Sequence, residues 1–374
     1  MNQPLRPVLT QSVTLFGERD PFRFDCGATL PSVSVAYETY GTLSSRGDNA
    51  ILICHALTGN AHAGGFASDD PRSAGWWEPI VGPGRALDTD RYCVICSNIL
   101  GSCYGTTGPS TMNPSTGRPF GLSFPQMTVR DMVRLQKALL DFLGVRALVT
   151  VLGGSLGGMQ ALEWALMEPA MVRSVIPIGT AARHSPWCIG LNDIARQAIM
   201  SDPEWRDGDY YGKGQPRRGL SLARQVAMVS YRSDVSFLKR FGRERVRGTL
   251  ESARFDPANL FQVERYLRYQ GEKLVDRFDA NSYIYITRAM DLHDVTEGRA
   301  ETVEAVLGRI RIPALCVGIA SDVLYPVHEQ KGIAAAIPGA HYAEIQSNDG
   351  HDAFLIEYEQ MSGMIREFFR LHRL

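Results

Sequence analysis

The segment from Val149 to Leu162 holds the residue best placed to do chemistry, Ser155. A β-branched run leads directly into the pattern Gly-x-Ser-x-Gly, and a helical pattern follows without a break. Small residues on both sides of the serine permit a tight turn from strand to helix, which exposes the hydroxyl above the helix N-terminus. The segment therefore predicts a nucleophilic serine. A glycine-rich turn that only packs a helix on a strand is the structural alternative.

A nucleophilic serine needs a base that takes its proton and a carboxylate that orients this base. After a strand–serine–helix turn of this kind, the carboxylate comes first along the chain and the histidine second. Asp322 directly follows the apolar run Ala314 to Val317. His351 lies in a polar turn that follows the strand-like run Tyr342 to Ile345. Parallel sheets carry their sites at the carboxyl ends of strands, so we predict Asp322 and His351 as the partners of Ser155.

Acyl transfer also needs backbone N–H groups that stabilise a negatively charged oxygen. One donor is the amide of the residue after the nucleophile, Leu156. The second is expected on the loop after an early strand, and the loop that follows Ala50 to Ile53 places Leu57 there. His55 lies on the same loop but precedes the serine in the chain. We therefore interpret His55 as a residue that shapes the loop, not as a catalytic base.

Strands that alternate with helices must position these residues. Strand-like runs are predicted at 32–37, 50–54, 92–96, 148–152, 172–178 and 314–319. The apolar spacing from Thr128 to Leu143 predicts a helix, with Thr128 as its N-cap and Gly144 after its end. This alternation predicts an α/β fold with a mostly parallel central sheet and helices on both faces.

The alternation of strands and helices stops at residues 185–303. This stretch has helical patterns, such as Leu220 to Phe241, and many charged residues, but almost no strand-like run. Sheet-like sequence resumes on its far side. We therefore predict a helical lid at 185–303, inserted into one core made of 1–184 and 304–374. A separate helical domain in tandem is the alternative.

Several motifs together resemble the homoserine O-acetyltransferase family of the α/β-hydrolase superfamily. They are Cys54 to His62, Trp76-Trp77, Ser97 to Ser110, Gly153 to Gln160 and Ser321-Asp322. The most specific of them reads Asn-x-x-Gly-x-Cys-x-Gly-Thr-Thr-Gly-Pro-Ser, and the similarity extends from about Phe16 to the C-terminus. The resemblance implies an α/β-hydrolase core with an inserted helical lid, and a homodimer.

The resemblance also implies a reaction and the residues that perform it. Members transfer an acyl group from acyl-CoA to the hydroxyl of homoserine, through an acyl-serine, in methionine biosynthesis. We expect acetyl-CoA as cosubstrate, with no resident cofactor and no metal. Ser155, Asp322 and His351 match the family's catalytic triad. Arg224 matches a lid arginine that holds the substrate carboxylate, and Asp352 matches the contact to its ammonium group; opposite charges suit the two ends of an amino acid.

Several alternatives stay open at this point. The donor can be succinyl-CoA and the acceptor serine, and no residue of the sequence decides either choice on physical grounds. A catalytically inactive homologue that binds a ligand or a partner is the alternative from another class, which the complete Ser, Asp and His set disfavours. For Arg224 the alternative is a solvated helix residue, and we interpret Tyr231 as a packed aromatic residue.

Composition limits the partners. The 374 residues carry 39 basic and 40 acidic side chains, which create no field that holds nucleic acid or an anionic membrane. The only apolar stretch of near-membrane length, Leu148 to Met167, contains Glu163 and four glycines, so no membrane segment is predicted. Seven scattered cysteines, with Cys93 and Cys96 in a strand-like run, predict reduced thiols. Because the start also lacks a signal-peptide pattern, we expect a cytoplasmic protein.

Overall fold

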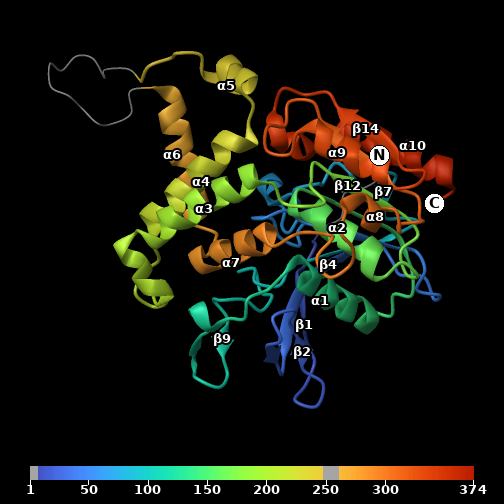
Figure 1. Cartoon of the computed structure of the whole chain (residues 1–374), viewed down its shortest axis with the longest axis horizontal. Helices are drawn as coiled ribbons and strands as arrows, with labels where there is room; N and C mark the ends of the chain where they lie inside the picture. The colour runs from blue at the N-terminus through green and yellow to red at the C-terminus, as the bar shows by residue number, and fades with distance from the viewer. Residues whose placement is uncertain (1–6, 247–260) are drawn as a thin grey trace.

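The computed structural model describes residues 7–246 and 261–374. These residues form an eight-stranded sheet surrounded by helices (Figure 1). In spatial order its strands are β1 (Gln11–Leu15), β4 (Val33–Tyr40), β8 (Cys93–Ser97), β5 (Ala50–Cys54), β11 (Leu148–Gly154), β12 (Val175–Ile178), β13 (Leu315–Ile319) and β14 (His341–Ile345). The strands from β8 to β14 are parallel, and β4 is antiparallel to both of its neighbours. The predicted α/β fold with a mostly parallel sheet is confirmed.

Both faces of this sheet are buried. In β5, Ile51 and Ile53 belong to a core cluster that includes α10 (Tyr358–His372). Leu52 and Cys54 belong to a second cluster, which includes α1 (Val129–Phe142), α2 (Leu156–Met167), α8 (Val303–Leu307) and α9 (Val327–Ala336). Alternate residues of a strand point to opposite faces, so a strand covered on both sides needs the continuous apolar run that the sequence has here.

The predicted elements agree with the observed ones apart from their ends and one edge strand. The helix predicted from Thr128 is α1, and Thr128 caps it by accepting a hydrogen bond from the Asp131 amide at 3.2 Å. The sequence pattern did not predict β1, because its polar residues alternate over only a short stretch. Its pairing with β4 stabilises it at the edge of the sheet.

Several short elements complete the core. They are the strands β2 (Phe22–Arg23), β3 (Thr29–Leu30), β6 (Val81–Gly82), β7 (Leu87–Asp88), β9 (Met112–Asn113) and β10 (Arg118–Pro119), and the 3₁₀ turns η1 (Pro71–Ser73), η2 (Gly121–Ser123) and η4 (Gly350–Leu355). The last of these carries His351.

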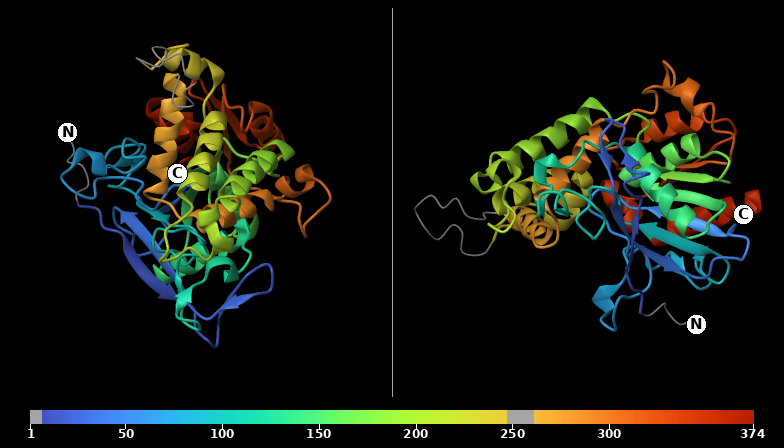
Figure 2. Two further views of the ribbon diagram at one scale, coloured as in Figure 1. Left: turned by 90° about the vertical axis from the view of Figure 1, so that its left-hand side faces the viewer. Right: turned by 90° about the horizontal axis from the view of Figure 1, so that it is seen from below.

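A group of helices between β12 and β13 stands at one end of the sheet, in the upper left of Figure 1 and to the left in the right-hand view of Figure 2. They are α3 (Pro186–Met200), η3 (Pro203–Gly208), α4 (Arg217–Tyr231), α5 (Asp234–Phe241), α6 (Gln262–Val275) and α7 (Ala280–Asp291). The helical pattern predicted from Leu220 to Phe241 forms two helices, because Arg232 is extended and Ser233 caps α5.

The two ends of this helical stretch lie side by side. Arg183 and Asp294 form a β-bridge, and their side chains form an ion pair at 2.6 Å. The stretch therefore leaves and rejoins the core at one place. Residues 247–260 of the predicted lid and 1–6 of the predicted core, where the sequence was searched for a signal peptide, lie outside the described residues.

Two further expectations concern the membrane and the cysteines. Within residues 7–246 and 261–374, no helix combines the length and the apolar character that crossing a membrane requires. All seven cysteines are free, and Cys93 and Cys96 are buried in β8. The interpretation of this pair as strand residues is confirmed.

Candidate active site

Ser155 lies on the turn between β11 and α2, as the sequence pattern predicts. Its backbone has φ 59° and ψ −124°, a region that residues with a side chain seldom adopt. Hydrogen bonds hold this conformation, because the Ser155 amide donates to the Ile178 carbonyl and Thr180 Oγ1 donates to the Ser155 carbonyl, at 2.9 and 2.8 Å. The strain is thus maintained by the neighbouring strand β12, and it presents the serine side chain away from the turn.

The turn is also closely packed. A Cβ atom at Gly153 or Gly157 would collide with the carbonyl oxygen of Cys54, and one at Gly154 would collide with the ring of Phe354. Glycine at these positions lets α2 start directly against the end of β5. The loop after β5 therefore lies next to the serine.

Asp322 and His351 meet at the carboxyl ends of β13 and β14. His351 Nδ1 donates to Asp322 Oδ2 at 2.7 Å. The other carboxylate oxygen, Oδ1, accepts from the amides of Leu324 and Tyr325 at 2.8 and 2.9 Å. An ionised carboxylate only accepts hydrogen bonds, so the proton is on Nδ1 and Nε2 is left to act as a base. Nε2 is buried and has no hydrogen-bond partner among the described residues.

The surroundings of His351 set its pKa. Burial against the rings of Tyr325, Phe354 and Tyr231 would lower the pKa of His351, but the charge of Asp322 and the hydrogen bond to it more than offset that effect. The pKa of His351 is therefore raised above its usual value. A charged imidazole next to the serine is stabilised at the point where proton transfer would create it.

Two backbone amides belong to the chain around Ser155. Leu156 is the first residue of α2, so its N–H has no acceptor inside the helix. Leu57 follows β5, which pairs with β11, and it lines the same cavity as Ser155. The chain continues from β5 to β8 on one side and later to β11 on the other, so these loops meet at the switch point of the sheet.

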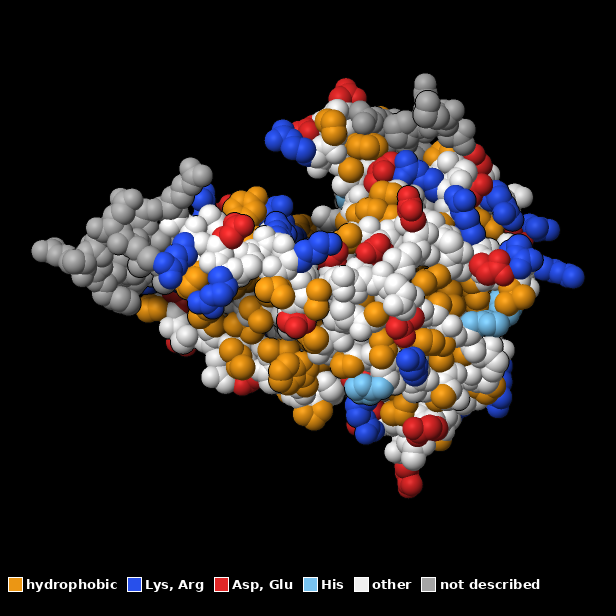
Figure 3. Space-filling model, turned by 90° about the horizontal axis from the view of Figure 1, so that it is seen from above, with side chains coloured by type: hydrophobic (Ala, Val, Ile, Leu, Met, Phe, Trp, Pro, Cys, Tyr) orange, Lys and Arg blue, Asp and Glu red, His pale blue; other side chains and the backbone are white. Residues whose placement is uncertain are grey.

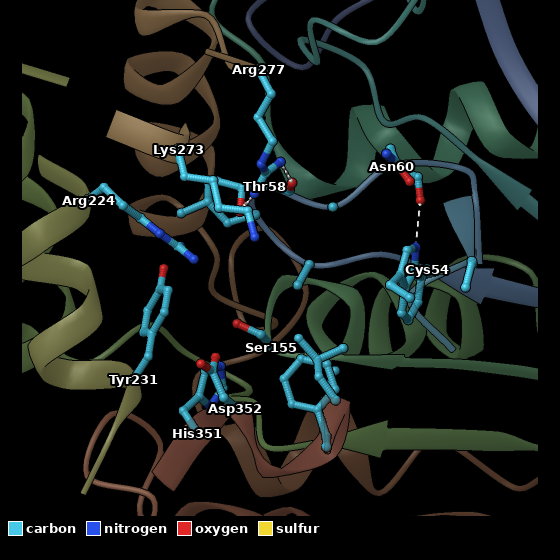
Figure 4. Close-up of a pocket in the computed structure, with 18 of the residues that line it drawn as sticks. Cys54, Thr58, Asn60, Ser155, Arg224, Tyr231, Lys273, Arg277, His351 and Asp352 are labelled. Atoms are coloured by element: carbon cyan, nitrogen blue, oxygen red, sulfur yellow. Dashed lines mark hydrogen bonds between the residues drawn. The ribbon is translucent and has the colours of Figure 1, made fainter. Parts of the chain in front are cut away.

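A cavity of about 530 Å³ opens above Ser155 between the core and the lid. Figure 4 shows Arg224 and Tyr231 on one side of it, His351 and Asp352 below them, and Lys273, Arg277 and Thr58 above. The Arg224 guanidinium lies over the Tyr231 ring, 5.4 Å from its centroid. All seven predicted site residues thus lie around one point: Ser155, Asp322, His351, Leu57, Leu156, Arg224 and Asp352.

A serine, a histidine with a free Nε2 and two amides around one cavity can form and break an acyl ester. Comparisons with known proteins agree with this geometry. The protein-family model described as alpha/beta hydrolase fold matches residues 49–358 of this chain. The homoserine O-acetyltransferase of Carboxydothermus hydrogenoformans is 51% identical over 98% of this chain and 97% of its own length. That of Moorella thermoacetica is 53% identical over 92% of each chain.

The chain belongs to the homoserine O-acetyltransferase family. Its structure superposes on the crystal structure of homoserine O-acetyltransferase from Bacillus anthracis with a TM-score of 0.88, at 30% identity, over 97% of this chain and 98% of the other. A solved esterase superposes with a TM-score of 0.87 at 28% identity, over 96% of this chain and 99% of its own. The same architecture therefore serves proteins named as transferases and as hydrolases.

Two residues beside Asp352 and the cavity were not predicted as site residues. Arg232, where α4 ends, pairs through Nε with Asp352 Oδ2 at 3.2 Å and through Nη1 with Asp349 Oδ1 at 2.8 Å. Tyr231 packs against the core as expected, and it also lines the cavity. For Tyr231 the available signal was its spacing of seven residues from Arg224 on α4, whereas Arg232 is extended beyond the end of this helix.

The pairing with Arg232 modifies the expectation for Asp352. Burial raises the pKa of Asp352, while Arg232, Arg224 and His351 lower it, and the net shift is upward. The carboxylate is 19% exposed, so one side is bound by Arg232 and the other faces the cavity. A substrate ammonium group bound on that side would share the Asp352 carboxylate with Arg232.

A second, much smaller cavity of about 20 Å³ also touches Ser155. Its walls come from the lid helices α3, α4 and α7 and from the chain after β13, and they include Cys188, Ala227, Met290 and Leu324. A cavity of this size holds about one methyl group or one water molecule. Among the described residues, no group of three His, Cys, Asp or Glu side chains is arranged to hold a metal.

Proposed function

We propose that this protein transfers an acetyl group from acetyl-CoA to the hydroxyl of L-homoserine, through an acetyl-serine on Ser155, in methionine biosynthesis. The observation that carries the proposal is the pair formed by His351 and Asp322, with the unpartnered Nε2 of His351, in a chain about half identical to curated homoserine O-acetyltransferases. Acetyl-CoA is a cosubstrate in this proposal, and no resident cofactor takes part.

The first half-reaction acylates the serine. His351 Nε2 takes the proton of the Ser155 hydroxyl, and Oγ attacks the thioester carbon. The Leu57 and Leu156 amides donate to the oxygen that becomes negative. The C–S bond then breaks, the thiolate of CoA takes the proton from His351, and acetyl-serine remains.

The second half-reaction reverses these roles with a new nucleophile. His351 takes the proton of the homoserine hydroxyl, whose oxygen attacks the acetyl-serine carbon. The C–Oγ bond breaks, Ser155 recovers its proton, and O-acetylhomoserine leaves. Water is a competing nucleophile, so we assign to residues 185–303 the role of a lid that excludes it, over a core of 1–184 and 304–374.

The charges of the cavity support an amino acid as acceptor. Arg224 faces the cavity from the lid, and Asp352 lies beside His351. A carboxylate on Arg224 and an ammonium group on Asp352 would turn the side chain of homoserine toward Ser155. The charge-assisted hydrogen bonds that this pose provides are the stronger kind.

The small cavity supports an acetyl donor over a succinyl donor. The leaving CoA needs the wide cavity, so we place the methyl group of the acetyl-serine in the small one. Its volume of about 20 Å³ accepts a methyl group but not the two methylenes and carboxylate of a succinyl group.

Two further features belong to the proposal. We propose a homodimer, since large apolar side chains on the lid are exposed: Ile194, Met200, Leu222, Val229, Val235, Leu238 and Tyr269. Figure 3 shows apolar side chains among basic ones on the lid, at the left of that view. Light scattering on the purified protein tests the dimer.

We also propose a cytoplasmic location, because all seven cysteines are free.

A thiol-release assay tests the reaction. Acetyl-CoA and succinyl-CoA are each supplied with homoserine, with serine and with no acceptor, and O-acetylhomoserine is measured by mass spectrometry. The proposal requires thiol release from acetyl-CoA that depends on homoserine. Thiol release that does not change when homoserine is left out would indicate a hydrolase. Binding of homoserine without thiol release from either donor would indicate an inactive homologue.

A further inference from the structure

The direction of the Leu57 N–H is determined by the carbonyl of Ala56. These two groups belong to one planar trans peptide, so they point in opposite directions. The Ala56 oxygen accepts two hydrogen bonds, from His55 Nδ1 at 2.8 Å and from the Gly59 amide at 2.9 Å. A contact that fixes the Gly59 amide therefore also fixes the direction of the Leu57 N–H, through the Ala56 carbonyl.

His55 has a defined protonation state in this arrangement. Its Nε2 accepts a hydrogen bond from the Ile99 amide at 3.2 Å, so the proton must be on Nδ1. Burial lowers the pKa of His55 to about 4, which keeps the ring neutral. The expected loop-shaping role of His55 thus has a specific form: it is one of two donors to the Ala56 carbonyl.

The second donor leads to the lid. The Gly59 amide shares a peptide plane with the Thr58 carbonyl, and this carbonyl accepts from Arg277 Nη1 at 2.8 Å (Figure 4). Arg277 comes just after α6, and the same nitrogen donates to the Tyr104 hydroxyl at 2.6 Å. The ring of the next residue, Phe278, packs edge-on against that of Tyr104, 5.8 Å between centroids. The Arg277 guanidinium is therefore held by two acceptors, the Thr58 carbonyl and the Tyr104 hydroxyl.

These contacts form one continuous chain of hydrogen bonds. It runs from the Arg277 guanidinium to the Thr58 carbonyl, from the Gly59 amide to the Ala56 carbonyl, and ends at the amide of Leu57, a residue that lines the cavity. Both peptide dipoles point the same way, with the positive end toward the reacting oxygen. A cation at the far end of such a chain polarises every bond along it.

We propose that Arg277 is a positioning residue for the acyl-transfer reaction, which aligns and polarises the Leu57 amide through the Thr58 and Ala56 carbonyls. This inference rests on the proposed function, because it takes Leu57 as an oxyanion donor. It also gives a role to the specific run of residues 97–110, whose Tyr104 holds the arginine and whose Ile99 fixes His55. The lid thus completes the oxyanion site that the core begins.

A competing role for Arg277 is a direct contact with the phosphates of CoA. Arg277 is exposed and lines the wide cavity together with Lys273. The two roles predict different kinetics. A phosphate contact affects only donors that carry phosphates, whereas alignment of the Leu57 amide affects every acyl donor.

The experiment measures acylation of Ser155 by two donors, acetyl-CoA and p-nitrophenyl acetate, in the full-length protein and in Arg277→Met. The second donor has no phosphate. Removing one direct oxyanion donor costs about 10² to 10³ in rate, and Arg277 acts through such a donor, so we expect about a tenfold lower acylation rate with both donors. The KM for p-nitrophenyl acetate should stay unchanged. A loss confined to acetyl-CoA, or no loss, would overturn the proposal.

Three further variants separate alignment from general damage. Lys273→Met removes the neighbouring cation of the same cavity and should leave the rate with p-nitrophenyl acetate unchanged. Arg277→Lys should recover part of that rate. Tyr104→Phe frees the guanidinium without touching the loop, and we expect about a threefold loss with both donors. If Arg277→Met lowers the melting temperature strongly, Tyr104→Phe decides, and an unchanged rate in that variant would overturn the proposal.

Failure of the proposed function would look different. If the unmodified protein is acylated by p-nitrophenyl acetate but transfers nothing to homoserine, the acceptor is wrong. The comparison of Arg277 variants with this donor still stands in that case, because it involves neither CoA nor homoserine.

Discussion

At the edge of the sheet the charged groups of the site are paired with each other, whereas the lid directs a cation into the cavity. Asp322 is saturated by His351 and two amides. Arg224 lies over an aromatic ring beside open space. The His351–Asp322 pair of the core is therefore complete without substrate, and Arg224 of the lid awaits one. Changes at this pair should slow the reaction with every substrate, and changes at Arg224 should affect only the fit of the acceptor.

The largest effect is expected for Ser155→Ala. Without Oγ no acyl-enzyme forms, so turnover should fall by about 10⁶-fold, as when a serine nucleophile is removed from other enzymes. Mass spectrometry after mixing with acetyl-CoA should show the acetylated chain only in the unmodified protein. Circular dichroism controls for the fold. Full turnover in this variant would rule out the acyl-serine.

Asp322→Asn should lower the acylation rate by about 10⁴-fold, because the imidazole loses its orientation and its counter-charge. It also changes the pH profile. His351 must be neutral to act as base, so activity rises with pH through its pKa, which lies above the usual value in the unmodified protein. Without Asp322 only the charge of Asp352 still opposes the effect of burial, and the pKa of His351 falls. The rising limb should therefore move to lower pH, and a limb that stays in place would show that Asp322 does not set it.

Arg224→Met tests the lid side of the comparison. Hydrogen bonds to charged groups contribute about 1.5–3 kcal/mol, so the KM for homoserine should rise about 10- to 100-fold. The acylation rate with p-nitrophenyl acetate should not change. Arg218→Met is the matched control, since Arg218 is exposed on the same helix and does not line the cavity. A slower acylation step in Arg224→Met would contradict the division between core and lid.

The smallest effect is expected in the small cavity, where lid and core meet. Leu324→Ala keeps the backbone bond to Asp322 and enlarges the space around the proposed methyl site. The rate with propionyl-CoA relative to acetyl-CoA should rise about fivefold, because one methylene in a tight pocket is worth about 1–3 kcal/mol. Leu355→Ala enlarges only the wide cavity and should leave this ratio unchanged. An equal rise in both variants would remove the small cavity from acyl selection.

The sequence was informative where local pattern determines structure. Ser155 is fixed by a strand, a turn and a helix that are adjacent in the chain, and Asp322 and His351 follow predictable strands. Arg232 and Arg277 could not be predicted in the same way. Each contacts a loop that is far away in the sequence, Asp349 and Asp352 for one and Thr58 for the other. Such contacts depend on how the lid helices pack, which local spacing does not encode.

The tight packing of the serine turn limits how this enzyme can be changed. An added Cβ atom would strike a neighbour at four glycines of this turn. At Gly153 and Gly157 the neighbour is the backbone carbonyl of Cys54, and at Gly154 and Gly158 it is a side chain. A backbone atom cannot move aside as the end of a flexible side chain can. Mutant libraries that seek new acyl donors or acceptors should therefore keep the codons of Gly153 and Gly157 fixed and vary the lid residues around the cavities.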